Sequence, residues 1–303
     1  MSYELGLIGL GKMGMYMAQR MLSQGSINLH VHDREEERLE AIAKDGATTH
    51  SSIDALVGGL WEPRKTVWMM VPAGDASEEV FNALLERLQA DDIIIDGGNA
   101  HYEDSMRRAE RCKAQGIHFL DVGVSGGLHG KDEGYGMMIG GDEEPFRYAL
   151  PVFEALGRKE GYARVGLSGT GHYVKMVHNA IEYGMMQAIA EGFTLLREGE
   201  RPPEDLETVA HIWNHGTIIS SFLMQMTEQA LRQEDFNTLA ACVDDTGEGR
   251  WAVHEAINSG VPFPVNSAAL FARKASQGKD DFTNRMLSAM RHEFGGHQIY
   301  KRR

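Results

Sequence analysis

The chain has 303 residues, of which 42% are hydrophobic, and it carries 30 lysine and arginine residues against 44 aspartate and glutamate residues. This length and apolar content predict one or two folded domains with a sizeable core and argue against broad disorder. The net charge of −14 argues against a partner that is a nucleic acid or an anionic membrane. A few converging cations can still bind a small anionic substrate.

The sequence predicts neither a membrane span nor a secretory signal. Its apolar runs are too short to cross a bilayer, and its first residues lack the order of charged, apolar and small residues that a signal peptide has. Only two cysteines, Cys112 and Cys242, are present, so no disulfide framework is expected. We therefore expect a protein of the reducing cytoplasm.

The first half of the chain alternates short apolar runs with longer amphipathic stretches. Five runs are predicted as strands: Tyr3–Ile8, Asn28–His32, Thr66–Val71, Ile93–Asp96 and His118–Val122. Met13–Gln24 and Arg34–Lys44 are predicted as helices. This alternation predicts a doubly wound, Rossmann-type α/β domain, in which helices cover both faces of a parallel sheet.

The second half of the chain is dominated by helical patterns, and glycines cluster at 166, 169 and 171 just before the longest of them. The predicted helices are His172–Glu198, Glu204–Asn214, Ile218–Arg232 and Arg250–Ser259. We therefore predict a dinucleotide-binding domain over residues 1–168 and an all-α domain over residues 169–303.

A glycine-rich turn follows the first predicted strand and opens the first predicted helix. Its residues are Gly9, Leu10, Gly11, Lys12, Met13 and Gly14. The pattern G-x-G-x-x-G allows a tight turn, a close approach of a pyrophosphate, and close packing of helix on strand. The phosphates then meet the N–H groups and the positive end of the helix dipole. Strand, turn and helix together predict a dinucleotide site.

The end of the second predicted strand bears on which dinucleotide is used. Asp33 stands there, 19 residues after Gly14. A carboxylate at this position accepts hydrogen bonds from the ribose hydroxyls of NAD and repels the 2′-phosphate of NADP. Arg34 follows, and it can contact adenine or a phosphate, or simply face solvent. The sequence therefore predicts a preference for NAD, with NADP use possible.

One predicted helix carries an unusual set of polar residues. At about 100° per residue, Lys175, Asn179, Glu182 and Tyr183 lie on one face. The apolar residues between them predict that the helix is largely buried: Val174, Met176, Val177, Ile181 and Met185. Buried lysine and glutamate are rare unless they are paired or functional. The other interpretation is a solvated face with a Lys–Glu pair.

These motifs together resemble the 6-phosphogluconate dehydrogenase family, in its short form, within the β-hydroxyacid dehydrogenase superfamily. The resemblance runs from Gly6 to about Tyr300 and rests on five further stretches: Met69–Gly74, Asp96–Asn99, Gly123–Gly127, Phe271–Arg273 and Arg291–His297. The family implies decarboxylating oxidation of 6-phospho-D-gluconate to D-ribulose 5-phosphate and CO2, a step of the pentose phosphate pathway. It also implies that the helical domain binds substrate and forms dimers.

The resemblance assigns roles to residues. Lys175 would take the C3 hydroxyl proton and later donate to the enolate oxygen, and its pKa must be lowered to act as a base. Glu182 would protonate C1 of the enediol that remains after CO2 leaves. The substrate carboxylate and hydroxyls would be bound by Asn99, Ser125, Gly126, Gly127, His178 and Asn179. Val71, Pro72, Ala73 and Asn99 would join the glycine turn, Asp33 and Arg34 at the cofactor.

The phosphate end of the substrate would meet Tyr183, Arg273, Arg291 and His297. In longer members of the family the tail residues act in the partner's site, so Arg291 and His297 imply a homodimer or homotetramer. The chain departs from those members at the second phosphate loop, where Thr246 and Glu248 replace a lysine and a threonine. This exchange weakens the expectation of tight phosphate binding there, unless Arg250 compensates.

Two other functions are compatible with parts of the pattern. A non-decarboxylating 3-hydroxyacid dehydrogenase would use the glycine turn and Lys175 but has no need of Glu182. A non-catalytic dinucleotide sensor would need neither Lys175 nor Asn179. The 13 histidines are scattered, and the sequence predicts no metal site.

Overall fold

The computed structural model describes residues 3–279, 281–295 and 298. The chain divides into two compact units, Met1–Met176 and Val177–Arg303. Within the described residues, no helix is both long enough and apolar enough to cross a membrane.

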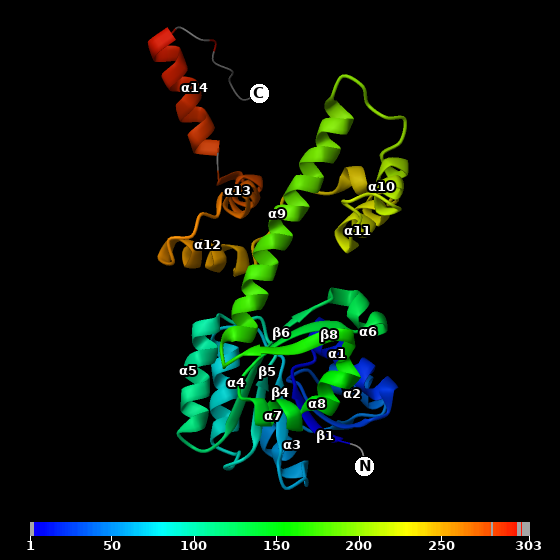
Figure 1. Ribbon diagram of the computed structural model, residues 1–303, viewed down its shortest axis with the longest axis vertical. Helices are drawn as coiled ribbons and strands as arrows, with labels where there is room; N and C mark the ends of the chain where they lie inside the picture. The colour runs from blue at the N-terminus through cyan, green and yellow to red at the C-terminus, as the bar shows by residue number, and fades with distance from the viewer. Residues whose placement is uncertain (1–2, 280, 296–297, 299–303) are drawn as a thin grey trace. The chain divides into compact units, whose positions relative to one another are not determined.

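The first unit is built on one sheet of eight strands in the order β3-β2-β1-β4-β5-β6-β7-β8 (Figure 1). The strands are β1 (Tyr3–Ile8), β2 (Ile27–His32), β3 (Thr48–Thr49), β4 (Thr66–Met69), β5 (Ile93–Asp96), β6 (His118–Ser125), β7 (Tyr135–Gly140) and β8 (Gly157–Gly166). β1 to β6 are parallel, in the order 3-2-1-4-5-6 of a dinucleotide-binding sheet. The predicted Rossmann-type domain is therefore confirmed.

Helices cover both faces of this sheet. They are α1 (Lys12–Gln24), α2 (Glu36–Ala43), α3 (Ile53–Gly59), α4 (Asp75–Leu85), α5 (Tyr102–Lys113), α6 (Gly130–Glu133), α7 (Glu143–Tyr148) and α8 (Leu150–Leu156). Neighbouring strand residues belong to opposite cores: Trp68 packs with α1 and α8, whereas Val67 and Met69 pack with α3 and α4. In Figure 1, α4 and α5 lie on one side of the sheet and α1, α2 and α8 on the other.

Two strands at one edge of the sheet were not predicted. β7 pairs antiparallel with β6, and β8 then pairs parallel with β7. β7 holds two glycines among its six residues, and β8 is mostly polar and partly exposed. Neither run has the continuous apolar character of a buried parallel strand, so the pattern used for the other strands did not reveal them.

The second unit consists of helices. Its long helix α9 (Thr170–Glu198) begins in the first unit, and the others are α10 (Leu206–Asn214), α11 (Phe222–Leu231), α12 (Glu248–Asn258), α13 (Pro264–Lys274) and α14 (Asp281–Gly295). One small core joins α9, α10 and α11 around Phe193, Ala210 and Met224. Another joins α9, α12 and α13 around Tyr183, Val253 and Leu270. The predicted all-α second domain is confirmed.

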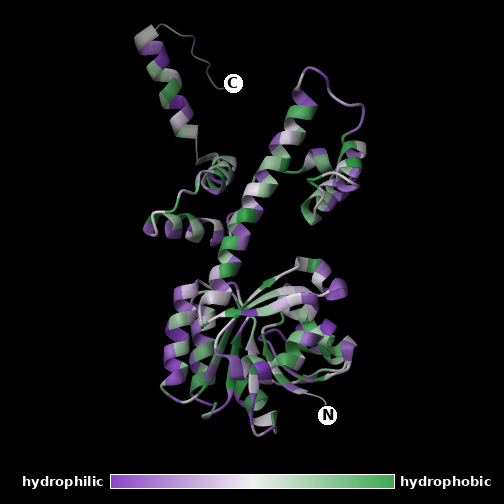
Figure 2. Ribbon diagram, viewed as in Figure 1, coloured by the Kyte–Doolittle hydropathy of each residue, from purple (hydrophilic) through white to green (hydrophobic). Residues whose placement is uncertain are grey.

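Burial along α9 is less complete than its sequence pattern predicts. Met176 and Tyr183 are buried, but Ile181 is 49% and Met185 is 42% exposed. The described residues leave this face of the helix uncovered. Figure 2 shows apolar bands alternating with polar ones along α9 and α14.

Candidate active site

The glycine turn is shaped by close backbone contacts. Gly9 has φ of 99°, and a Cβ built on it would lie 2.4 Å from the carbonyl oxygen of Met70. A Cβ on Gly14 would lie 2.1 Å from the carbonyl oxygen of Gly9. These two glycines are therefore required by the protein's own packing, which joins β1, α1 and the end of β4.

Gly11 has a different reason to lack a side chain. A Cβ at this position would meet none of the protein's atoms within 4 Å. Gly11 is also the N-cap of α1, whose first turn contains no acidic residue and has no side-chain cap. Open space and uncapped N–H groups at a helix N-terminus suit a bound pyrophosphate. The turn therefore fits a dinucleotide.

Asp33 follows β2 directly, and its carboxylate links two segments beside the turn. Oδ2 accepts a hydrogen bond from the N–H of Leu10 at 2.6 Å, and Oδ1 accepts one from the N–H of Glu35 at 2.8 Å. The guanidinium of Arg34 instead donates to Glu79 on α4 at 2.6 Å, and both of these side chains are mostly exposed. Asp33 therefore lies at the turn, while Arg34 is paired away from it.

The other predicted cofactor residues lie at the same edge of the sheet. Val71, Pro72 and Ala73 follow β4, and Asn99 follows β5. A Cβ on Gly98 would lie 2.6 Å from the carbonyl oxygen of Val71, so the two loops touch. The second loop is anchored by Asp96, whose buried carboxylate pairs with the buried Arg108 of α5 and accepts from the N–H of Gly98.

Ser125 is the last residue of β6, and Gly126 and Gly127 follow it at this edge. Gly126 has φ of 129° and Gly127 of 51°, which a residue with a side chain rarely adopts. The chain therefore leaves β6 through two residues in the left-handed region of φ.

Lys175 is brought to β6 by a glycine. A Cβ on Gly123 of β6 would lie 2.3 Å from the Cβ of Lys175, so only glycine allows this approach. The start of α9 is fixed nearby by Asp121, which is fully buried and accepts from the N–H groups of Gly169 at 2.6 Å and His172 at 2.9 Å. Lys175 is therefore held against Gly123, which lies two residues before Ser125 on β6.

Further along α9, polar side chains of the second unit form a hydrogen-bonded series. The Nδ1 of His178 lies 3.0 Å from the Oδ1 of Asn179 and 3.9 Å from the Oε2 of Glu182. The Nδ2 of Asn179 donates to the Oε1 of Glu248 at 2.8 Å. Since Oδ1 only accepts, His178 presents an N–H there and the orientation of the Asn179 amide is defined.

Glu248 is buried at the start of α12 and receives a second hydrogen bond. The hydroxyl of Thr246 donates to its Oε2 at 2.6 Å, and the hydroxyl oxygen of Tyr183 lies 3.4 Å from that of Thr246. The two residues that depart from the longer relatives therefore act together. The carboxylate faces Asn179 and Thr246, which places its charge within a hydrogen-bonded network.

The cationic residues considered for the substrate phosphate differ in their contacts and exposure. The guanidinium carbon of Arg273 lies 3.5 Å from the ring centre of Tyr183, and its Nη1 donates to the carbonyl oxygen of Asp244. Arg250 lies 3.7 Å from the buried carboxylate of Asp245. Arg291 is exposed on α14, and His297 lies outside the described residues. Tyr183 and Arg273 are thus brought together.

The roles of several residues were not predicted from the sequence. Asp121 has no motif of its own, and the role of Glu248 depends on a contact between residues 69 positions apart. His211 and His215 were overlooked as a pair, although their spacing of four residues is a recognised metal-ligand signal. In the structure they cluster with Glu228.

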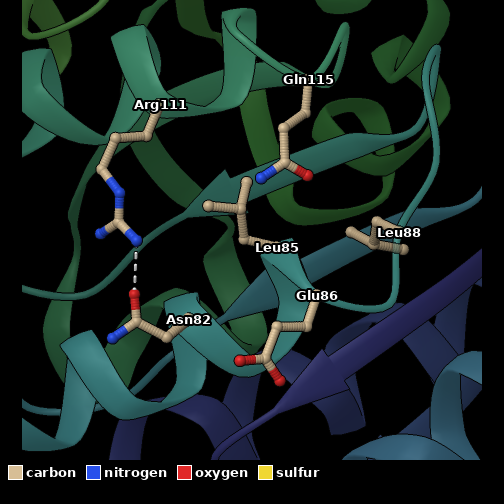
Figure 3. Close-up of a pocket in the computed structure, with 6 residues that line it drawn as sticks. All are labelled: Asn82, Leu85, Glu86, Leu88, Arg111 and Gln115. Atoms are coloured by element: carbon tan, nitrogen blue, oxygen red, sulfur yellow. Dashed lines mark hydrogen bonds between the residues drawn. The ribbon is translucent and has the colours of Figure 1, made fainter.

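A hollow on the first unit lies apart from all the predicted residues. It is lined by Asn82, Leu85, Glu86, Leu88, Arg111 and Gln115, from α4, α5 and the loops that follow them (Figure 3). Arg111 donates to Asn82 across it at 2.7 Å. The hollow lies away from the carboxyl edge of the sheet and contributes nothing to this site.

Comparison with known proteins gives the family. Residues 4–169 match the model described as the NAD binding domain of 6-phosphogluconate dehydrogenase, and residues 171–301 match that of its C-terminal domain. The chain is 40% identical to the NAD(+)-dependent, decarboxylating 6-phosphogluconate dehydrogenase of Haloferax volcanii, covering 99% of both chains.

Longer relatives are matched along part of their length. An NAD(+)-dependent, decarboxylating enzyme of Bacillus subtilis is 34% identical over 92% of this chain and 62% of its own. The structure of Plasmodium falciparum 6-phosphogluconate dehydrogenase, studied with NADP+ and with 6-phosphogluconate, is 30% identical, with a TM-score of 0.85 over 99% of this chain and 66% of that one. Motifs, fold and both family models agree, and the chain belongs to the 6-phosphogluconate dehydrogenase family.

Proposed function

We propose that this chain oxidises and decarboxylates 6-phospho-D-gluconate, releasing D-ribulose 5-phosphate and CO2, with NAD as the preferred cofactor and NADP as a possible one. The observation that carries the proposal is the polar face of α9, where Lys175, Asn179 and Glu182 follow one another at helical spacing from a start fixed by Asp121 and Gly123. Family membership supports it, as does the NAD(+)-dependent relative of equal length.

The cofactor residues are proposed as the glycine turn, Asp33, Arg34, Val71, Pro72, Ala73 and Asn99. NAD, when bound there, supplies the acceptor for a hydride from C3 of the substrate. The open space at Gly11 and the uncapped start of α1 fit its pyrophosphate. The carboxylate of Asp33 offers acceptors for ribose hydroxyls and disfavours a 2′-phosphate.

Lys175 is proposed as the general base and acid at the C3 oxygen. In its neutral form the amine takes the hydroxyl proton as the hydride leaves C3, which yields a β-keto acid. The carbon–carbon bond to the carboxylate then breaks, CO2 leaves, and the electron pair moves onto the ketone oxygen. The ammonium form of Lys175 donates a hydrogen bond to that oxygen, where negative charge develops.

Glu182 is proposed as the acid that delivers a proton to C1 of the resulting enediol. Its Oε2 lies 3.9 Å from the Nδ1 of His178, which is proposed to help bind the substrate carboxylate and hydroxyls. This step is needed only after CO2 leaves, and it separates the proposal from a non-decarboxylating 3-hydroxyacid dehydrogenase. Ser125, Gly126, Gly127, Asn99 and Asn179 are proposed to orient the substrate carboxylate and hydroxyls.

The substrate phosphate is assigned to Tyr183, Arg273, Arg291 and His297, the last two from a partner subunit in a homodimer or homotetramer. In support, Arg291 lies on α14 beside an exposed apolar stripe of Phe282, Met286 and Met290, spaced four residues apart. An apolar stripe of this kind is suited to packing against a second chain. We also propose the division at residues 168 and 169 as the functional domain boundary and, from the two free cysteines, a cytoplasmic setting.

The test is a direct assay. The purified chain is incubated with 6-phosphogluconate or gluconate and with NAD or NADP, and reduced cofactor and CO2 are measured together. One CO2 per reduced cofactor, with 6-phosphogluconate and NAD preferred, is the expected result. Reduced cofactor without CO2 would support the non-decarboxylating alternative, and no turnover with any pair would support the sensor.

A further inference from the structure

A cluster of two histidines and a glutamate lies on the helix pair α10 and α11. His211 and His215 are four residues apart at the C-terminal end of α10, and Glu228 faces them from α11. One donor atom from each residue lies within 4.8 Å of the other two. The imidazole rings are 4.2 Å apart between centres and tilted by 36°. No residue of the proposed reaction belongs to this cluster.

The hydrogen bonds of the cluster define where its protons are. The Nδ1 of His215 lies 2.7 Å from the carbonyl oxygen of His211, which can only accept, so Nδ1 carries the proton and Nε2 keeps a lone pair. A histidine oriented through one nitrogen in this way presents the other to a metal ion. The Nδ1–H of His211 donates to the Oε1 of Glu228 at 2.9 Å.

The charges in and around the cluster leave room for a cation. Glu228 also accepts from Arg232 at 2.6 Å, and Arg232 in turn donates to Glu207 at 2.7 Å. Two carboxylates against one guanidinium leave a net charge of −1 when the histidines are neutral. The Glu228 side chain is 8% exposed, so water compensates little of its charge.

The scaffold that carries these side chains is packed. Ala210, next to His211, and Met224, one turn before Glu228, are fully buried in a core shared with Phe193. The histidines themselves are exposed on the outer side of α10. A rigid base with an open outer side allows an ion to enter and allows water to complete its coordination.

We infer that His211, His215 and Glu228 bind one divalent transition-metal ion of the zinc class. One nitrogen from each imidazole and one oxygen of Glu228 hold the ion, and water completes the shell. Zn²⁺ suits this set of nitrogen and carboxylate donors, and bonds of about 2.0–2.2 Å require donor atoms roughly 3–3.5 Å apart. The His211–Glu228 separation of 2.9 Å is near this, and the donor atom of His215 lies within 4.8 Å of both.

Binding has a defined chemical consequence. The ion takes the place of the Nδ1 proton that His211 donates to Glu228, and that proton moves to Nε2, so the imidazole stays neutral and no net proton is released. The ion also ties the end of α10 to α11, because its ligands come from both helices. It therefore braces the helix pair and takes no part in hydride transfer or decarboxylation.

The experiment uses the full chain after treatment with EDTA and dialysis. Zn²⁺ is titrated by calorimetry, Co²⁺ is titrated by visible absorption, and thermal unfolding is followed with and without Zn²⁺. We expect one saturable site per chain, a four- or five-coordinate Co²⁺ spectrum and a higher melting temperature with Zn²⁺. His215→Gln and Glu228→Gln should each weaken binding at least tenfold, and His254→Gln, an exposed histidine of α12, should leave it unchanged.

His215→Gln is the decisive variant, because its side chain is exposed and its loss leaves the core intact. Its metal-free melting temperature and its activity should match those of the unmodified chain. Absence of saturable binding overturns the inference, as does Zn²⁺ binding that survives His215→Gln at full affinity, which would place the ion elsewhere, for example at the exposed Cys242.

Discussion

The two units of this chain differ in how completely they bury their apolar side chains. Among the described residues, the first unit exposes five large apolar side chains: Trp61, Met106, Leu128, Val165 and Leu167. The second and smaller unit exposes nineteen, four of them on α14. A sheet covered by helices on both faces is complete within one chain. The helices of the second unit leave apolar faces that a second chain would cover, which is the physical basis of the proposed oligomer.

The same contrast holds for the chemistry. In the first unit the proposed ligand contacts come largely from backbone groups and from the absence of side chains, as at Gly11 and Gly126. In the second unit they come from side chains held in networks, as in the series from His178 to Tyr183. Cofactor binding and chemical turnover should therefore be separable by mutation.

The largest expected effect is at Lys175. Lys175→Met should lower kcat by at least about 10²–10⁴-fold, because it removes a general acid and base, while NAD binding should change little. Stopped-flow hydride transfer and a direct NAD titration measure the two. Lys159→Met, at an exposed lysine of β8, serves as the control. Near-normal turnover in Lys175→Met would show that the base is another group.

The next effect tests whether the second unit completes the site of a partner. Arg291→Ala should lower kcat/KM for 6-phosphogluconate about 10–100-fold, since a charge-assisted hydrogen bond is worth about 1.5–3 kcal/mol. Mixing it with Lys175→Met should restore activity, because one site of each hybrid carries both lesions and the other carries none. Hybrids are verified by mass, and hybrids that form without restoring activity would place Arg291 in the site of its own chain.

Much of the first unit could be predicted from the sequence because its signals are local. Runs such as Ile93–Asp96 are continuous and apolar, and the turn from Gly9 to Gly14 carries its own spacing. β7 and β8 could not be predicted, because an edge strand with glycines or with exposed polar residues has no such run. Four helices of the second unit, α9 to α12, were predicted with differences of up to four residues at their ends, whereas α13 and α14 were not predicted.

The site was predictable where one helix or one turn carries it. Lys175, Asn179 and Glu182 could be placed on one face from spacing alone. The partners of those residues could not, because they depend on long-range contacts: Glu248 with Asn179, and Gly123 with Lys175. The substitution at Glu248 suggested a loss of phosphate binding, and only the fold revealed the hydrogen bonds that its carboxylate accepts.

A smaller effect is therefore expected at Glu248. Glu248→Ala should lower kcat/KM for 6-phosphogluconate by about tenfold or more, because the amide of Asn179 and the hydroxyl of Thr246 lose their acceptor. Glu248→Gln keeps an amide oxygen in that place and should stay within about threefold of the unmodified chain. Steady-state kinetics of both variants decide the matter. A large gain for Glu248→Gln would instead mean that the charge of Glu248 repels the substrate phosphate.

The smallest effect concerns the first unit and the choice of cofactor. Asp33→Asn should lower the ratio of kcat/KM for NAD to that for NADP by roughly tenfold. Two like charges at about 4 Å repel by about 1–4 kcal/mol, and the variant removes this repulsion of a 2′-phosphate. The amide oxygen of asparagine can still accept from the N–H of Leu10, so the turn should keep its shape.

Arg34 supplies the matched comparison, since its pairing with Glu79 holds it away from a 2′-phosphate. Glu79→Gln should release it and raise kcat/KM for NADP only a few-fold, because an exposed ion pair is worth about 0–1 kcal/mol. The kinetics of the unmodified chain and both variants with each cofactor form one experiment. If the unmodified chain favoured NADP tenfold or more, the carboxylate of Asp33 would serve only to hold Leu10 and Glu35, and Arg34 would determine the choice of cofactor.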